Sequence, residues 1–206
     1  GLDGAVGAAF DGWDSTGSRA ADVDRFTADD FVAVSFLSVN PPPAAARELL
    51  SERAGHFSTM LAALGQDLDL ADMVQPMPDD WIGWHLMKEL CSIRGVNTTI
   101  ASKLLARKRP RLRPVWDSVV SRVTGTETRQ WEPLRLELRK NDRNLHHRLV
   151  RLRDAAGLPD EVTILRVFDV ICWCEGTRWR PTSTVLALPP RTGPTSQNAA
   201  GRSWWR

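Results

Sequence analysis

The sequence predicts an all-α protein built as an array of about eight or nine short helices. Apolar residues recur at helical spacing in several segments, and proline- or glycine-rich breaks separate these segments. No segment of weight alternates apolar and polar residues as a half-buried strand does, and no internal repeat is present.

The first half of the chain contains four expected helical segments. Thr27 is a good N-cap for a helix over about 28–38. Pro41–Pro43 ends that helix and begins the next, because proline is tolerated in a first helical turn. Two short amphipathic stretches follow, around Leu49–Arg53 and Phe57–Leu64.

The middle of the chain predicts a pair of helices. Asp79 and Asp80 are expected to cap a helix that reaches Ile93, and a break at Arg94–Asn97 leads into a second helix from Thr98 to about Arg107. A basic connector with two prolines follows. Further helices are expected over 116–123, 132–139, 141–155 capped by Asn141, and a last one capped by Asp160.

This pattern divides the chain into three parts. Residues 1–21 are rich in Gly, Ala, Asp and Ser and are expected to form a loosely held arm, with Phe10 and Trp13 as contacts to the body. Residues 22–180 form the helical domain, and residues 181–206 form a Pro/Ser/Thr/Gly-rich tail. A length of 206 residues suits one domain or two small lobes that share a core.

Composition excludes an integral membrane protein, because no apolar run approaches the roughly 18 residues that a membrane span needs. Three cysteines, Cys91, Cys172 and Cys174, cannot form a closed set of disulfides and are typical of a reducing compartment. We therefore expect a cytoplasmic protein, associated with the nucleoid if it acts on DNA. Cys172 and Cys174 are expected to be buried thiols or a weak redox pair.

The net charge of +2 conceals a division. Residues 1–93 carry 15 acidic and 5 basic side chains, whereas residues 94–206 carry 10 acidic and 22 basic ones. A basic half is typical of a partner such as nucleic acid, but the two halves could instead attract each other within the fold.

The segment Ile93–Ala101 carries the most information. Gly95 can adopt backbone angles that other residues avoid, and Asn97 is the next best residue for a left-handed turn. The turn is expected to expose backbone amides at the start of the helix from Thr98, where the helix dipole favours an anion. Ala101 is small enough to let the two helices approach closely.

These residues resemble the helix–hairpin–helix superfamily of DNA glycosylases, including a poorly characterised actinobacterial branch. The usual hairpin there is Leu-Pro-Gly-Val-Gly, then two or three variable residues and an Ala, and several members place a catalytic Asp 22 residues after the first hairpin glycine. In this chain that position is Asp117, within a segment similar to the family's Val-Asp-Thr-His-Val-x-Arg-Val. The resemblance implies a two-lobed fold with a cleft, a hairpin over 81–107 and a catalytic-type helix over 115–124.

The resemblance implies a monofunctional glycosylase that flips a damaged or modified base of duplex DNA and hydrolyses its N-glycosidic bond, with Asp117 catalytic. Trp81, Trp84 and Trp116 are candidates for the base pocket or a wedge, although core packing is the default for the first two. The residues expected to contact the DNA backbone are Arg94, Gly95, Val96, Asn97, Thr98, Lys103, Arg107, Lys108, Arg109, Arg111 and Arg113.

The chain departs from the family pattern in ways that limit the chemistry. Thr99 stands where bifunctional members carry a Schiff-base lysine, so lyase chemistry by that route is not expected. The four-cysteine motif of one branch is missing, so no iron–sulfur cluster is expected. No cofactor is required, and the resemblance implies a site for a monovalent cation at the hairpin carbonyl groups.

Several alternatives stay open. An aspartate that opens a helix is more often a cap than a catalyst. A second basic run over 135–153 can face the acidic half instead of DNA, and a metal site at His146-His147 is not expected. The chain could be a non-catalytic DNA- or RNA-binding module, or a fold adapted to a small-molecule substrate. We expect a monomer.

Overall fold

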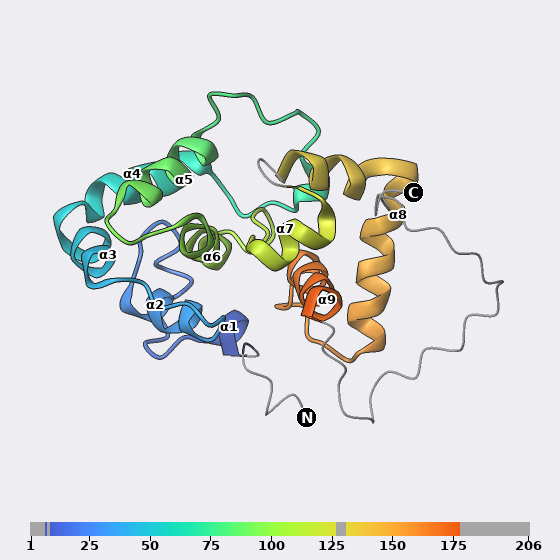
Figure 1. Cartoon of the computed structure of the whole chain (residues 1–206), viewed down its shortest axis with the longest axis horizontal. Helices are drawn as coiled ribbons and strands as arrows, with labels where there is room; N and C mark the ends of the chain where they lie inside the picture. The colour runs from blue at the N-terminus through green and yellow to red at the C-terminus, as the bar shows by residue number, and fades with distance from the viewer. Residues whose placement is uncertain (1–6, 8, 127–130, 178–206) are drawn as a thin grey trace.

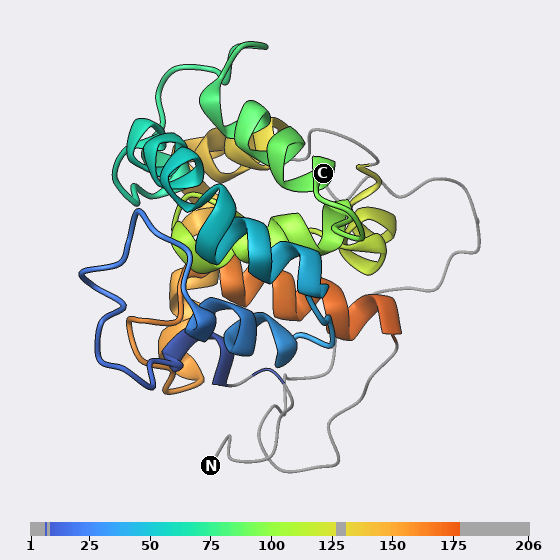
Figure 2. The same cartoon turned by 90° about the vertical axis from the view of Figure 1, so that its left-hand side faces the viewer.

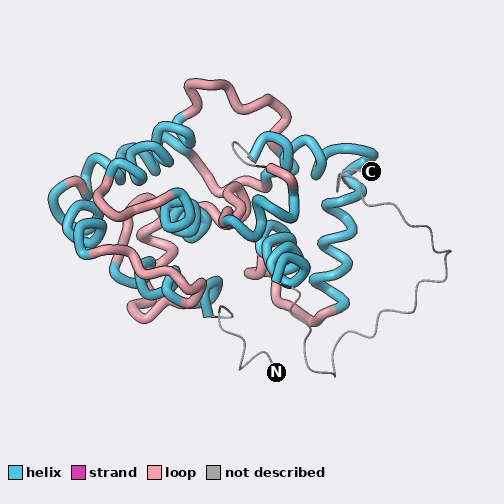
Figure 3. The backbone as a smooth tube through the Cα atoms, viewed as in Figure 1, coloured by secondary structure: helices cyan, strands magenta, loops and turns pink. Residues whose placement is uncertain are grey.

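The computed structural model describes residue 7, residues 9–126 and residues 131–177 of the chain. Over these residues the protein is all-helical and contains no strand, which confirms the predicted class (Figure 3). The α-helices are α1 (Ala9–Gly12), α2 (Ala28–Ser35), α3 (Pro43–Arg47), α4 (Ala54–Leu64), α5 (Ile82–Ser92), α6 (Thr98–Lys108), α7 (Ser118–Thr124), α8 (Trp131–Ala155) and α9 (Ile164–Thr177). A short π-helical segment, Glu48–Glu52, lies between α3 and α4, and a 3₁₀ turn, Leu70–Asp72, lies between α4 and α5.

The helices form two groups (Figure 1). Helices α1 to α6 lie on one side, where α6 packs against α2 and α5 and α4 packs against α5. Helices α7, α8 and α9 lie on the other side, where α9 packs against both α7 and α8. The 3₁₀ turn Leu70–Asp72 packs against α8 and so ties the first half of the chain to the second.

Helix α6 is the central element of the first group. Every residue from Ile100 to Lys108 is buried, including the charged ones. Leu104 and Leu105 are completely excluded from solvent, as are Leu86 and Leu90 of α5 across from them. A helix with no solvent-exposed face must satisfy its charged side chains inside the protein, and this requirement shapes the site described below.

The helix starts were predicted with mixed success. Thr27 precedes α2 as expected, and the Asp30 carboxylate accepts a hydrogen bond of 2.8 Å from the Thr27 amide. The predicted caps at Asp79 and Asp80 are wrong, because α5 begins at Ile82 with Trp81 in the N-cap position. Asp160 is not a cap either: α9 begins later, at Ile164, and Asp160 pairs with Arg153 at 2.9 Å.

Helix α8 contains the break that was expected near residue 140. Asn141, Asp142 and Arg143 all adopt positive φ angles, of 49°, 50° and 61°. Asn141 is therefore part of a left-handed link between two helical segments and not the N-cap of the second. Arg143 reaches across to Asp72 at 2.7 Å, an ion pair between α8 and the turn that packs on it.

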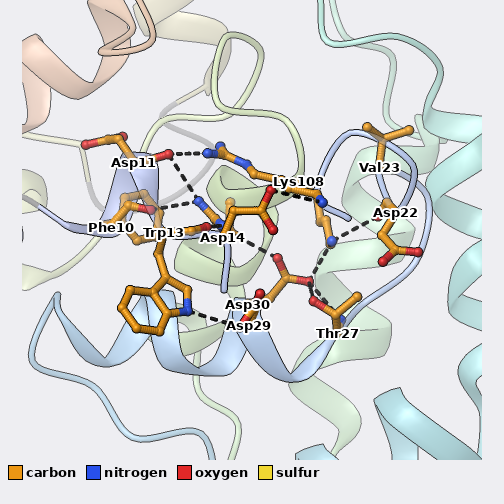
Figure 4. Close-up of polar contacts among 12 residues, drawn as sticks. Phe10, Asp11, Trp13, Asp14, Asp22, Val23, Thr27, Asp29, Asp30 and Lys108 are labelled. Atoms are coloured by element: carbon orange, nitrogen blue, oxygen red, sulfur yellow. Dashed lines mark hydrogen bonds and ion pairs between the residues drawn. The ribbon is translucent and has the colours of Figure 1, made fainter. Parts of the chain in front are cut away.

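The N-terminal arm is not loosely held over its described residues 9–21. Phe10 is buried, and the Trp13 indole nitrogen donates to the Asp29 carboxylate at 3.1 Å (Figure 4). Arg107 of α6 donates to the carbonyl oxygen of Phe10 at 2.8 Å. Hydrogen bonds to the backbone, which composition does not reveal, fix the arm. The predicted tail 181–206 lies outside the described residues.

Among the described helices, none is both long enough and apolar enough to cross a membrane.

Candidate functional site

The turn between α5 and α6 adopts the predicted hairpin. Gly95 has a φ of +84°, the conformation for which glycine was expected. The Val96 amide donates to the Ile93 carbonyl at 2.9 Å, which closes the turn, and the Val96 side chain is buried. Asn97 is not left-handed: it is the N-cap of α6, in an extended conformation, and its side-chain oxygen accepts from the Ile100 amide at 2.9 Å.

The hairpin presents a polar tip to solvent. Arg94, Gly95, Asn97 and Thr98 are exposed, whereas Val96 anchors the turn in the core. The amides of the first turn of α6 face this tip, and the helix dipole adds a partial positive charge. The tip therefore offers a place for an anion such as a phosphate group.

Asp117 lies at the start of α7 and uses its two oxygen atoms differently. Oδ1 accepts hydrogen bonds from the amides of Val119 and Val120, at 2.9 and 3.0 Å, and so caps the helix. Within the part of the chain that the structure describes, Oδ2 accepts no hydrogen bond and lies 3.9 Å from Nζ of Lys103. The side chain is 16% exposed.

Lys103 and Ser102 of α6 position the segment that carries Asp117. The Ser102 hydroxyl donates to the Trp116 carbonyl at 2.7 Å, and the Trp116 amide donates back to it at 3.2 Å. Nζ of Lys103 donates to the Leu37 carbonyl at 2.8 Å. Burial lowers the pKa of Lys103, although the neighbouring Asp117 and Asp169 carboxylates oppose this shift.

A second carboxylate, which sequence reasoning missed, lies near Asp117. Asp169 of α9 is buried and forms an ion pair with Arg166 one turn before it. Burial raises the pKa of Asp169 to about 6, and the negative charge of Asp117 adds to this shift. Arg166 also pairs with Asp11 at 3.1 Å, which links the N-terminal arm to α9. The only feature of the sequence that could have indicated Asp169 was an aspartate among the apolar residues of a helix face.

Cys172 and Cys174 do not form a redox pair. Both are free thiols on α9, two residues apart, so their side chains leave the helix in different directions. Burial raises the pKa of Cys172 to about 12, and the negative charges of Asp169 and Asp117 contribute to the same increase. A thiol with so high a pKa is a poor nucleophile and a poor metal ligand. Among the described residues no cluster of three or more His, Cys, Asp or Glu could hold a metal ion.

The structure corrects the expected DNA contacts of the first basic run. Five of its six side chains are buried and cannot reach a phosphate on the surface; they are Lys103, Arg107, Lys108, Arg109 and Arg113. Arg111 is half exposed and pairs with Asp69. These basic side chains therefore form hydrogen bonds and ion pairs inside the protein, because α6 is enclosed on all sides.

The partners of these cations come mostly from the acidic first half of the chain. Oδ2 of Asp30 lies 2.6 Å from Nζ of Lys108, and Oδ1 of Asp30 lies 3.4 Å from Nε of Arg107. Asp24 forms an ion pair with Arg109. The second basic run behaves in part in the same way, as the Arg143 pair with Asp72 shows. Part of the charge division thus serves attraction between the two halves, as the second of the two interpretations expects.

The tryptophan candidates separate into two groups. Trp81 and Trp84 pack with the buried Trp131, and the Trp84 and Trp131 rings stack at a centroid distance of 4.5 Å. The Arg113 guanidinium lies 3.6 Å from the Trp81 ring and 4.4 Å from that of Trp131. This cluster is part of the core, in which Trp131 is buried and Trp81 and Trp84 are half-buried. Trp116 alone stands next to Asp117.

The fold and the site together define an all-helical protein in which a helix–turn–helix hairpin lies beside a helix-capping aspartate. The chain belongs to the family of unknown function DUF6308, whose model matches residues 2–176. Neither the comparison with curated proteins nor that with solved structures gives a match.

Proposed function

We propose that this protein is a monofunctional glycosylase-like hydrolase that cleaves the N-glycosidic bond of a flipped-out base, with Asp117 as the catalytic carboxylate. The observation that carries the proposal is the difference between the two carboxylate oxygens of this side chain. Oδ1 is fixed by two amides of α7, while Oδ2 accepts no hydrogen bond from the described residues and lies 3.9 Å from Nζ of Lys103. A carboxylate held in this way has one oxygen in a defined position for a substrate.

The chemistry follows from where charge develops. Loss of the base leaves positive charge on the sugar ring, and a carboxylate beside the ring stabilises it. The same Oδ2 can accept a proton from the water that attacks the sugar carbon. Lys103 acts as a positioning residue: its ammonium group, held by the Leu37 carbonyl, lies on the Oδ2 side of Asp117. Thr99 carries no amine, so the proposed reaction is hydrolysis.

The hairpin supplies the grip on the nucleic-acid backbone. Its exposed amides and Arg94 lie at the N-terminal end of α6, and Lys103 lies five residues further along. At 1.5 Å per residue this separation is roughly 8 Å along the helix axis. Lys103 in turn lies 3.9 Å from Oδ2 of Asp117, so α6 connects the proposed phosphate site to the proposed catalytic carboxylate.

The test is release of free base from duplexes that carry uracil, alkylated, oxidised or mismatched bases, with Asp117→Asn as the informative variant. Asparagine caps helices as well as aspartate does, so the variant keeps the start of α7 and loses only the charge. We expect a loss of base release of at least about 100-fold, the usual effect of removing an acid–base group. Asp160→Asn is the control, because this side chain is 91% exposed and remote from the site.

Two outcomes would contradict the proposal. If Asp117→Asn releases base as fast as the wild type, Asp117 is only a helix cap. If duplexes bind tightly but no base is released from any of them, the hairpin belongs to a binding module without catalysis.

A further inference from the structure

Arg113, in the connection between α6 and α7, is a buried cation without a counter-ion. It is 1% exposed, and its Nε, Nη1 and Nη2 atoms find no hydrogen-bond partner. Burial lowers the pKa of Arg113 well below its usual range, the like charge of Arg109 adds to this shift, and no carboxylate of the described residues opposes it. Because an unpaired charge inside a protein is strongly unfavourable, an anion beside Arg113 would stabilise the folded state.

The aromatic side chains around Arg113 supply no acceptor. The Arg113 guanidinium lies 3.6 Å from the centroid of the Trp81 ring and 4.4 Å from that of Trp131. An indole has a donor but no acceptor, and Nε1 of Trp131 is itself buried without a partner. Four buried nitrogen donors of Arg113 and Trp131 therefore lack an acceptor within the described part of the chain. An anion, which only accepts, would meet this need.

The guanidinium of Arg113 lies against the first turn of α5. A Cβ added at Gly83, the second residue of α5, would lie 2.3 Å from Nη2 of Arg113. Trp81, in the N-cap position, makes no side-chain cap, and the amides of Ile82 and Gly83 donate to no backbone or side-chain atom of the described residues. Uncapped amides and the helix dipole add partial positive charge at the same place.

The nearest acidic residues in the sequence do not fill this role. Glu132, which follows Trp131, places both carboxylate oxygens on Arg135, at 2.7 and 2.8 Å. Asp79 and Asp80 are exposed, and neither side chain caps the first turn of α5.

Trp81 forms the outer wall of this place. Its ring is half-buried, whereas Trp131 is 1% exposed. Trp81 follows the connection 73–80, the loop at the top of the molecule in Figure 2. The ring also lies over Gly83, whose added Cβ would be 2.6 Å from its Cζ3. Turning the Trp81 side chain outward therefore uncovers both Gly83 and the Arg113 guanidinium.

We propose that Arg113 and the first turn of α5 bind a small monocarboxylate. One carboxylate oxygen accepts from the Arg113 guanidinium and the other from the amides of Ile82 and Gly83, an arrangement that a single-atom anion cannot reproduce. One negative charge neutralises the one buried cation, whereas a dianion such as phosphate would bring an unpaired charge into the core. Asp117 takes no part in this site, so the binding test and the base-release test fail independently.

The experiment is a pair of fluorescence titrations of the full chain, with sodium acetate and with sodium chloride, at an ionic strength kept constant with sodium fluoride. Trp81 and Trp131 contact Arg113 and report on its surroundings. We expect a saturable change in emission with acetate, and an affinity at least about tenfold higher than for chloride, because charge-assisted hydrogen bonds form to two oxygens.

Two variants at this position and one control make the test specific. Arg113→Met removes the charge and should weaken acetate binding by about tenfold or more; removal of an unpaired buried cation keeps the variant folded. Arg113→Lys keeps the charge but has no planar fork, so it should lose the preference for acetate over chloride. Arg47→Met, at an exposed arginine of α3, should bind acetate as the wild type does.

The outcomes separate the parts of the proposal. Absence of a saturable change in the wild type, or equal acetate affinity in the wild type and Arg113→Met, overturns the site. Equal affinity of the wild type for acetate and chloride overturns the carboxylate as its ligand. An unchanged preference for acetate in Arg113→Lys overturns the role of the guanidinium geometry.

Discussion

At the scale of the residue, Asp117 shows that capping a helix leaves one carboxylate oxygen outside the cap. Helix capping needs one acceptor oxygen, and a carboxylate has two. Oδ1 of Asp117 satisfies the α7 amides, which keeps the side chain in a single orientation. The other oxygen accepts no hydrogen bond from the described residues and lies 3.9 Å from Nζ of Lys103. Capping of α7 therefore does not exclude the catalytic role that we propose for Asp117.

Asp169 makes a testable contribution to stability. Its pKa is raised from 3.8 to about 6 in the folded protein, so the native state holds a proton that the unfolded chain has lost. Stability from this group is therefore present below pH 4 and is lost as the pH rises to 6 and above. At 1.36 kcal/mol per pKa unit, the loss amounts to about 3 kcal/mol.

The measurement is the free energy of unfolding in urea between pH 4 and pH 7 for the wild type and for Asp169→Asn. Because the other titrating groups are common to both proteins, their effects cancel in the difference. The wild type should lose stability relative to the variant as the pH rises. A difference that is constant over this range would show that Asp169 is ionised throughout.

At the scale of the element, the approach of α7 to α9 depends on one glycine. A Cβ added at Gly176 would lie 2.4 Å from Cγ1 of Val119 and 2.8 Å from Cγ2 of Val123. Asp117 is the N-cap of α7 and Asp169 lies on α9, so this contact also influences how the two carboxylates are placed relative to each other.

Gly176→Ala should lower the free energy of unfolding by about 1–2 kcal/mol. Overpacking costs 1–3 kcal/mol, and the better helix propensity of alanine returns up to about 1 kcal/mol. Gly55→Ala in α4 is the matched control, because nothing lies within 4 Å of its added Cβ, and it should stabilise the protein slightly. Equal effects in the two variants, measured by urea unfolding, would show that α7 and α9 can shift apart freely.

At the scale of the whole molecule, charge joins the two halves of the chain. Asp30 of α2 is almost fully buried and faces two buried cations of α6, Arg107 and Lys108. Two cations and one carboxylate inside the protein are tolerable only with the carbonyl oxygens that surround them, such as those of Phe10 and Asp22. The acidic half is in this sense the counter-ion of the basic half.

Asp30→Asn should cost about 3–5 kcal/mol, because it leaves two buried cations without their shared carboxylate. Urea unfolding at neutral pH measures the cost, with Asp160→Asn as an exposed control. The variant should also release the arm that Arg107 holds, which limited proteolysis near Trp13 would detect. A cost below about 1 kcal/mol would mean that the carbonyl groups alone satisfy these cations.

The sequence by itself determined the helical class, the Thr27 start of α2, the Gly95 turn and the bounds of α6, because each depends on spacing and backbone preference within a few residues. Only the tertiary structure decided which charges are buried. Lys103 to Arg113 has the composition of a solvated surface, yet α6 runs through the centre of its group. Contacts between residues far apart in the chain, such as Arg107 with Phe10 and Lys103 with Asp117, leave no local pattern. For the same reason Asp169 could be recognised only after α9 was placed beside α7, since burial and a neighbouring charge, and not its sequence context, set its chemistry.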